Sequence, residues 1–161
     1  MQKITLIFII SILICSCNFS AEVKSKTSDG HLKEKEYYSN GNLKNIRNYK
    51  NDTLHGVQLD YYKNGGIKDS VIMVNGKMNG KCYWWYENGK LKEKSNWKNG
   101  VSHGLVSHFY HNGKVQQVNS FNNGVINGKS NFYYKNGIKK SYGNWIVGKK
   151  EGEWHYFDSI F

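Results

Sequence analysis

Proline is absent from the 161-residue chain, and acidic residues are scarce. Because proline cannot donate a backbone hydrogen bond to a sheet, its absence leaves nothing to interrupt long β-ladders. Asp and Glu number 12 against 23 Lys and Arg, which gives a formal net charge of +11. This balance favours anionic partners such as phospholipid head groups or lipopolysaccharide. Lysines spread along exposed strands also prevent edge-to-edge aggregation, so a solvated basic surface is the alternative.

Motifs of common enzyme classes are also missing. The sequence contains no glycine-rich phosphate loop, zinc-ligand spacing or nucleophile elbow. His108 and His111 lie near His103 but are an odd number apart, so on a strand they would face opposite sides. Asp60 and Asp69 lie on neighbouring predicted strands and could form a carboxylate pair. We expect no enzyme, no catalytic, cofactor-binding or metal-binding residue, and no cofactor; a carbohydrate-active enzyme is the alternative.

The N-terminal segment resembles a bacterial lipoprotein signal. Residues 4–14 are almost purely apolar, yet too few to span a bilayer, which takes about 20 residues. Ile14 and Ser16 then precede Cys17 as in a lipobox. The resemblance implies cleavage after residue 16, diacylation of Cys17 and a place in the cell envelope. Asn18 favours the outer membrane. An uncleaved anchor or a plain signal peptide is the alternative, and nucleic acid is not an expected partner of such an exported protein.

Cysteine usage agrees with export. The chain has three cysteines, of which Cys15 would leave with the signal and Cys17 would carry lipid. Cys82 then has no cysteine to pair with in the mature chain. We expect it to be buried, because its neighbours Tyr83 and Trp84 are aromatic. Residues 17–30 are polar and aperiodic, and are predicted to form a tether between the signal peptide (1–16) and a repeat domain over 31–161.

The folded part repeats every 24 residues. Two aromatic residues, a variable residue and an Asn-Gly pair recur at this spacing, followed by a second turn and a closing glycine. Asn-Gly between β-forming residues is the strongest short hairpin signal, and a type I′ turn is expected there. The prediction is an all-β fold, a single antiparallel meander of β-hairpins with about 10–11 strands. The five pairs are Asn40-Gly41, Asn64-Gly65, Asn88-Gly89, Asn112-Gly113 and Asn136-Gly137.

Strand alternation predicts which side chains share a face. Leu91 and Trp97 are an even number apart, so they and their equivalents are expected on one inner face. Ile138 stands one position early in the fifth unit, with Lys139 in the aliphatic position, which predicts a local bulge.

The aromatic pairs form two rows whose members point to opposite faces. Core packing accounts for one row, whereas an exposed second row would mark a binding surface. The second row is the candidate binding surface: Tyr38, Tyr62, Tyr86, Tyr110 and Tyr134.

The repeat resembles the variant MORN repeat, and residues 80–100 show its pattern nearly whole. Bacterial proteins similar to this one are grouped as YwqK-type antitoxins of toxin–antitoxin systems. The resemblance implies a non-enzymatic protein that binds an unidentified protein partner, such as a toxin. A lipobox suits an envelope immunity protein better than a cytosolic antitoxin. Direct binding of anionic membrane lipid or lipopolysaccharide by the basic aromatic sheet is the alternative function.

Overall fold

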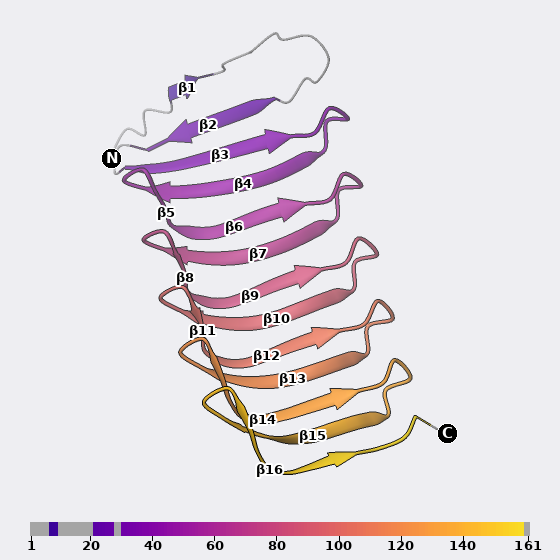
Figure 1. The fold of residues 1–161 in the computed structure, drawn as a ribbon. Coiled ribbons are helices and arrows are strands. Elements are labelled where there is room, and N and C mark those ends of the chain that lie inside the picture. Colours follow the sequence, from indigo (N-terminus) through magenta and orange to yellow (C-terminus); the bar gives the residue numbers. More distant parts are fainter. Residues whose placement is uncertain (1–6, 10–20, 28–29, 160–161) are drawn as a thin grey trace, which may run out of the picture. The chain divides into compact units, whose positions relative to one another are not determined.

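The computed structural model describes residues 7–9, 21–27 and 30–159, which form sixteen β-strands and no helix (Figure 1). Backbone contacts divide the chain into two compact units, residues 1–77 and 78–161. The short strand β8 (Lys77–Met78) lies at the boundary between them.

Each unit is a run of antiparallel strands paired in chain order. The first unit contains β1 (Ile7–Ile9), β2 (Glu22–Lys26), β3 (His31–Tyr37), β4 (Leu43–Lys50), β5 (Thr53–Leu54), β6 (Gly56–Tyr61) and β7 (Ile67–Val74). The second contains β9 (Gly80–Trp85), β10 (Leu91–Lys98), β11 (Val101–Ser102), β12 (Gly104–Phe109), β13 (Val115–Asn122), β14 (Val125–Tyr133), β15 (Lys139–Ile146) and β16 (Lys149–Tyr156). The predicted all-β meander of hairpins is therefore confirmed. The strand count exceeds the prediction because β1 and β2 add to the sheet and because β5, β8 and β11 are separate two-residue strands.

Strand β2 lies in the segment predicted to be a tether. It pairs with β3 from Glu22↔Glu36 to Lys26↔Leu32, and Lys24 bridges Glu22 and Glu34 at 3.2 and 2.9 Å. Backbone pairing thus orders a short polar stretch whose sequence shows no period. The structure differs here from the tether expected over 17–30. Cys17 and the lipobox lie outside the described residues.

The two turns of each repeat have different geometries. At the recurrent Asn-Gly pair only the glycine has a positive φ, such as 84° at Gly41. The Gly41 amide donates to the Tyr38 carbonyl and the Tyr38 amide to the Asn42 carbonyl, at 2.9 and 2.8 Å. This is a three-residue loop ending in a left-handed glycine, so the type I′ prediction is wrong at this turn. The type I′ pattern occurs at the second turn instead, where Asn75 and Gly76 have φ of 49° and 74°.

Four of the five closing glycines lie directly opposite a large side chain on the next strand. In the second unit Trp97, Phe121 and Trp145 oppose closing glycines, as Gly80↔Trp97 illustrates. In the first unit Met73 opposes Gly56. These glycines have positive φ, such as 86° at Gly80 and 82° at Gly104, a backbone conformation that favours glycine over other residues.

A register shift interrupts the alternation near each first turn. Leu91 pairs with Trp85, but Glu93 pairs with Trp84, so Lys92 is an extra residue. Leu91 therefore lies on the face of Trp85, whereas Trp97 lies on the opposite face with Gly80. The prediction that Leu91 and Trp97 share a face is wrong. The bulge predicted at Lys139 exists, because Tyr133 pairs with Lys139 across a shift, but all five hairpins carry the same shift.

The core is thin, because the strands of each unit form one layer. In the described part of the chain, Cys82 at 0% and Val106 at 5% exposure are the only buried hydrophobic residues. They belong to one cross-strand row with the small polar residues Ser95, Asn119 and Ser130. The predicted burial of Cys82 is confirmed. Because no second layer covers the sheet, side chains on both faces stay partly accessible to a ligand or partner.

Candidate functional site

The tyrosines of the predicted binding surface lie just after the first strand of each hairpin and are half-buried. Tyr86 donates its hydroxyl to the Phe109 carbonyl at 2.7 Å, and Tyr110 donates to the Tyr133 carbonyl at 2.7 Å. Each bond reaches 23 residues ahead, into the next hairpin. The same bond joins Tyr38 to Tyr61 and Tyr134 to Phe157. The row therefore links neighbouring hairpins while one part of each ring stays accessible.

Asparagine and lysine side chains link the same turns. Asn88 accepts the Lys90 amide through its Oδ1 at 3.0 Å and donates through Nδ2 to the His111 carbonyl at 3.0 Å. Lys90 donates to the Asn112 carbonyl at 2.9 Å. The side chain of the recurrent Asn therefore forms hydrogen bonds with the backbone of its own turn and of the next turn. The residue is needed for these side-chain bonds, because its backbone is not in the left-handed conformation.

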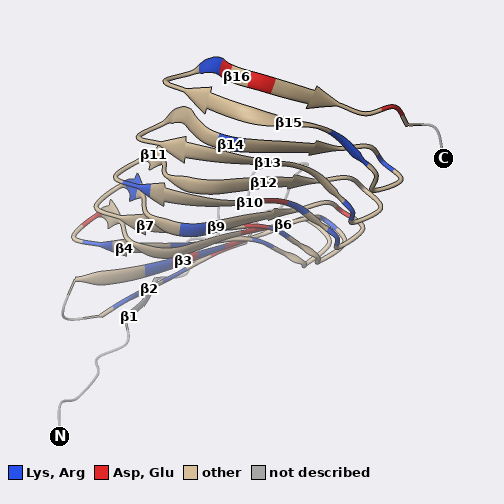
Figure 2. Cartoon of the chain, turned by 90° about the horizontal axis from the view of Figure 1, so that it is seen from below, with Lys and Arg blue, Asp and Glu red and all other residues tan. Residues whose placement is uncertain are grey.

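Two rings of the tyrosine row have a lysine ammonium beside them. The Lys92 ammonium lies 5.9 Å from the Tyr86 ring centroid, and the His111 ring stacks on Tyr86 at 3.6 Å. Lys140 lies 5.6 Å from the Tyr134 ring centroid. Lysines are spread over the strands and turns of both units (Figure 2). The surface around the row thus combines aromatic area with positive charge, a pairing that favours π-rich or anionic partners.

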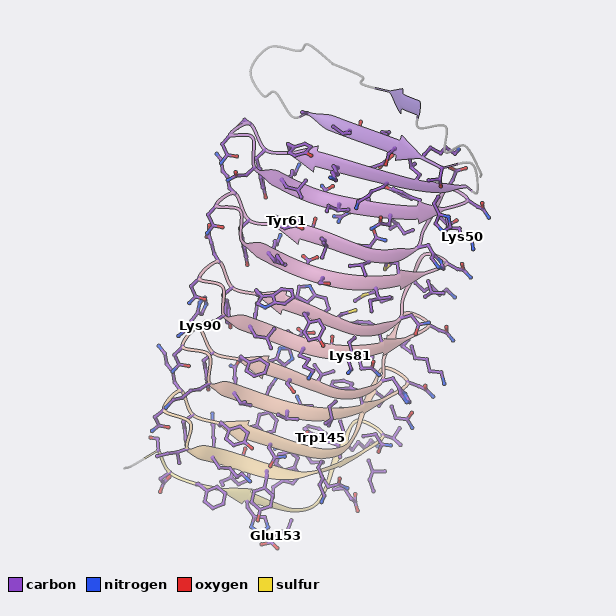
Figure 3. All side chains as sticks on the ribbon, turned by 180° about the vertical axis from the view of Figure 1, so that it is seen from behind. Lys50, Tyr61, Lys81, Lys90, Trp145 and Glu153 are labelled. Carbon is purple, nitrogen blue, oxygen red and sulfur yellow. The ribbon has the colours of Figure 1, made fainter. Side chains whose placement is uncertain are left out.

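An aromatic cluster on β14–β16 was not predicted from the sequence. Trp145 and Trp154 meet edge to face at 5.3 Å, and the Lys150 ammonium lies 4.3 Å from the Trp154 centroid. Figure 3 labels Trp145 on this sheet. Trp154 fits because Gly143 lies beneath it: a Cβ on Gly143 would come within 2.3 Å of the indole. The one available signal was Trp154 itself, which stands where earlier repeats carry smaller residues.

The two aspartates considered as a carboxylate pair are brought together. Asp60 and Asp69 are direct cross-strand partners, and Arg47 forms a 2.6 Å ion pair with Asp60. Burial, followed by the nearby Asp60 charge, raises the pKa of Asp69 to about 6. Because Arg47 pairs with Asp60 and Asp60 lies opposite Asp69, the three side chains form a charge network within the sheet.

The histidines considered as ligands are separated. His108 lies 3.5 Å from Glu93, its cross-strand partner, whereas His111 stacks on Tyr86. Among the described residues no group of three metal-ligating side chains occurs. Those residues also include no helix long and apolar enough to cross a membrane.

Comparison with known protein families identifies the repeat. The model of the MORN repeat variant matches residues 30–51, 78–99 and 102–123. The units between and after these matches have the same register shift and the same pairing of the closing glycine with a large residue. A search of curated proteins gave no match. The family of this repeat is generally non-catalytic and is associated with binding, and this chain is a β-hairpin repeat protein in which three segments match the variant MORN repeat.

Proposed function

We propose that this chain is a lipid-anchored envelope protein that binds another protein through its repeat sheet, in the manner of an antitoxin or immunity protein. The observation that carries the proposal is the accessible row of half-buried tyrosines on a single-layer sheet. Such rings offer large contact area at low conformational cost, which is why Tyr is enriched in binding hot spots. The candidate surface is the row Tyr38, Tyr62, Tyr86, Tyr110 and Tyr134.

The row is also held rigid before any partner arrives. Tyr86 and Tyr110 are fixed by 2.7 Å hydroxyl bonds, and His111 stacks on Tyr86. Preorganised side chains lose little entropy on binding, so more of the contact energy appears as affinity. The lysines beside the row favour a partner with acidic side chains.

Paired substitutions separate the binding role of the rings from their structural role. Tyr86→Phe with Tyr110→Phe keeps both rings and removes both hydroxyl bonds, whereas Ala at both positions removes the rings as well. The full chain and both variants are used as bait on detergent-solubilised envelope, and the affinity of the recovered partner is then measured. We expect the Phe pair to retain the partner and the Ala pair to lose it, with the fold checked by circular dichroism. If the partner binds the folded Ala pair as tightly as it binds the wild type, the proposal is wrong.

The lipid anchor is tested separately at Cys17. Cells expressing the wild type should incorporate radiolabelled palmitate into the protein, and Cys17→Ser should abolish the label. Cys15→Ser is the matched control, because it lies before the expected cleavage site and should keep the label. Label retained by Cys17→Ser would exclude this cysteine as the anchor.

A second candidate function is direct binding of anionic lipid or lipopolysaccharide. The observation that favours it is the net charge of +11 together with Lys92 and Lys140 against tyrosine rings. Cys17→Ser protein, which has no lipid anchor of its own, is mixed with two kinds of vesicle. One kind contains anionic lipid, and the other contains only zwitterionic lipid. Salt-sensitive binding to the anionic vesicles alone supports this function. No sedimentation with either at low salt excludes it.

A further inference from the structure

A polar pocket on β14–β16 lies apart from the tyrosine row. Its volume is about 370 Å³, and it is shallow and open to solvent, because the Lys129, Asn144 and Glu153 side chains that line it are exposed. Three adjacent strands line it, and Ser130 and Gly143 lie among the lining residues. The wall residues are Lys129, Asn131, Tyr142, Asn144, Glu153 and His155.

The register places these side chains in two parallel rows. Asn131, Tyr142 and His155 follow one another as direct cross-strand partners, and Lys129 pairs with Asn144 beside them. Directly opposed residues on antiparallel strands share a face, so both rows project from the same side of the sheet. The face is that opposite Ser130, because Lys129 and Asn131 flank it on β14.

One wall of the pocket is aromatic. The Tyr142 ring stacks on the His155 ring, with centroids 4.5 Å apart and planes 21° apart. Phe157 continues the stack at 6.0 Å from Tyr142. These three rings hold one another in place and present a fixed apolar border to the polar residues.

The other wall has polar groups that are not committed elsewhere. The side-chain amides of Asn131 and Asn144 make no hydrogen bond, and the Lys129 ammonium forms no ion pair, within the part of the chain that is described. Glu153, labelled in Figure 3, adds a carboxylate. That carboxylate lies 3.8 Å from the His155 imidazole. Amides, an ammonium and a carboxylate together both donate and accept hydrogen bonds.

The same chain contains a matched pocket of different chemistry. Two repeats earlier, a pocket of about 290 Å³ has Lys81 where Lys129 stands and Asn96 where Asn144 stands. There the ring position is taken by Lys94 and the carboxylate position by Leu105. Two lysines without an acid suit an anion, whereas Lys129 with Glu153 balances to zero charge. The last pocket is thus specialised by its aromatic wall and its neutral charge.

We propose that the pocket on β14–β16 binds a neutral saccharide. Sugar hydroxyls donate to the Glu153 carboxylate and to amide oxygens, and accept from Lys129 and the amide nitrogens. The apolar C–H face of a pyranose ring packs against the Tyr142–His155 wall. Because Lys129 and Glu153 balance, the site offers an anion no net charge to bind, which distinguishes it from the basic surface around the tyrosine row.

Titration with cellobiose and with N,N′-diacetylchitobiose tests the proposal. The full chain, isotope-labelled and held in detergent micelles, is followed by amide chemical shifts. We expect saturable shifts at Lys129, Asn131 and Asn144 with at least one of the two sugars. The absence of saturable shifts there with both sugars would overturn the proposal, as would tighter binding of inorganic phosphate at the same amides.

The variants use side chains that other repeats carry at the same positions. Asn131→Leu copies Leu59 and Asn144→Ile copies Ile72, so the double variant should fold while lacking both amides. Because two hydrogen bonds are lost, we expect the affinity for the sugar to fall by about tenfold or more. Lys81→Leu, in the matched pocket, is the control and should bind like the wild type. A folded double variant with wild-type affinity would contradict the assignment of these residues.

Discussion

Replacing Tyr110 with Phe removes one hydroxyl and leaves the ring in place. That hydroxyl donates to the Tyr133 carbonyl at 2.7 Å and joins two neighbouring hairpins of the second unit. A typical hydrogen bond contributes about 0.5–1.5 kcal/mol net, and an acceptor left without a partner adds to the loss when water is excluded. Tyr110 is half-buried, so water can reach the freed carbonyl in part. We therefore expect the free energy of unfolding to fall by about 1 kcal/mol.

Urea denaturation followed by circular dichroism measures this loss. The midpoint should move to lower urea with an unchanged slope, and the melting temperature should fall by about 2–4 °C for a chain of this length. Tyr156→Phe is the control, since that side chain is 63% exposed and its hydroxyl meets only the Lys150 ammonium at 3.0 Å. The control should change stability by less than about 0.5 kcal/mol. Equal losses in Tyr110→Phe and Tyr156→Phe would refute the stabilising role of the inter-hairpin bond.

Three further predictions concern pH, thiol reactivity and glycine. The pKa of Asp69 is raised from 3.8 to about 6 by burial and by Asp60, so the folded state binds the extra proton between about pH 4 and 6. The free energy of unfolding should fall by about 1 kcal/mol as pH rises through that window, after allowance for solvent screening. Asp69→Asn should flatten the dependence of the urea midpoint on pH, and an unchanged dependence would contradict the assignment. Cys82 is 0% exposed, so a thiol reagent should modify it roughly a hundredfold more slowly in native buffer than in denaturant, and equal rates would show that it is accessible. Gly128 has a φ of 103°, and a Cβ there would lie 3.2 Å from the Ser120 Cβ. Gly128→Ala should therefore lower stability by about 1–2 kcal/mol in the same urea assay, whereas an unshifted midpoint would exclude strain at this strand position.

The hairpin array was predictable because its signals are local. The spacing of Asn-Gly pairs and aromatic residues identifies turns and strands without reference to the rest of the chain. The turn type was not predictable, because both turns of a repeat contain Asn-Gly. At the first turn Asn88 bonds to the carbonyl of His111, 23 residues ahead, so a neighbouring hairpin takes part in selecting the conformation.

The candidate surface was predictable as a row but not in its detailed role. The period places Tyr86 and Tyr110 in the same position of successive hairpins. Their hydroxyl partners, Phe109 and Tyr133, depend on how those hairpins lie side by side. The pocket on β14–β16 could not be predicted from the sequence. Its polar residues come from three strands, and the register shifts between these strands break simple alternation.

The sequence by itself determined the repeat, the strand-rich architecture and the burial of Cys82, because each follows from residue types and spacing along one stretch of chain. Tertiary structure alone decided which face each side chain occupies, since a single extra residue at each first turn reverses the alternation. It also decided that Trp97 opposes Gly80 and that Asp60 directly opposes Asp69, because the register across each hairpin depends on an extra residue that the sequence period does not reveal. The surfaces available for binding depend on these pairings.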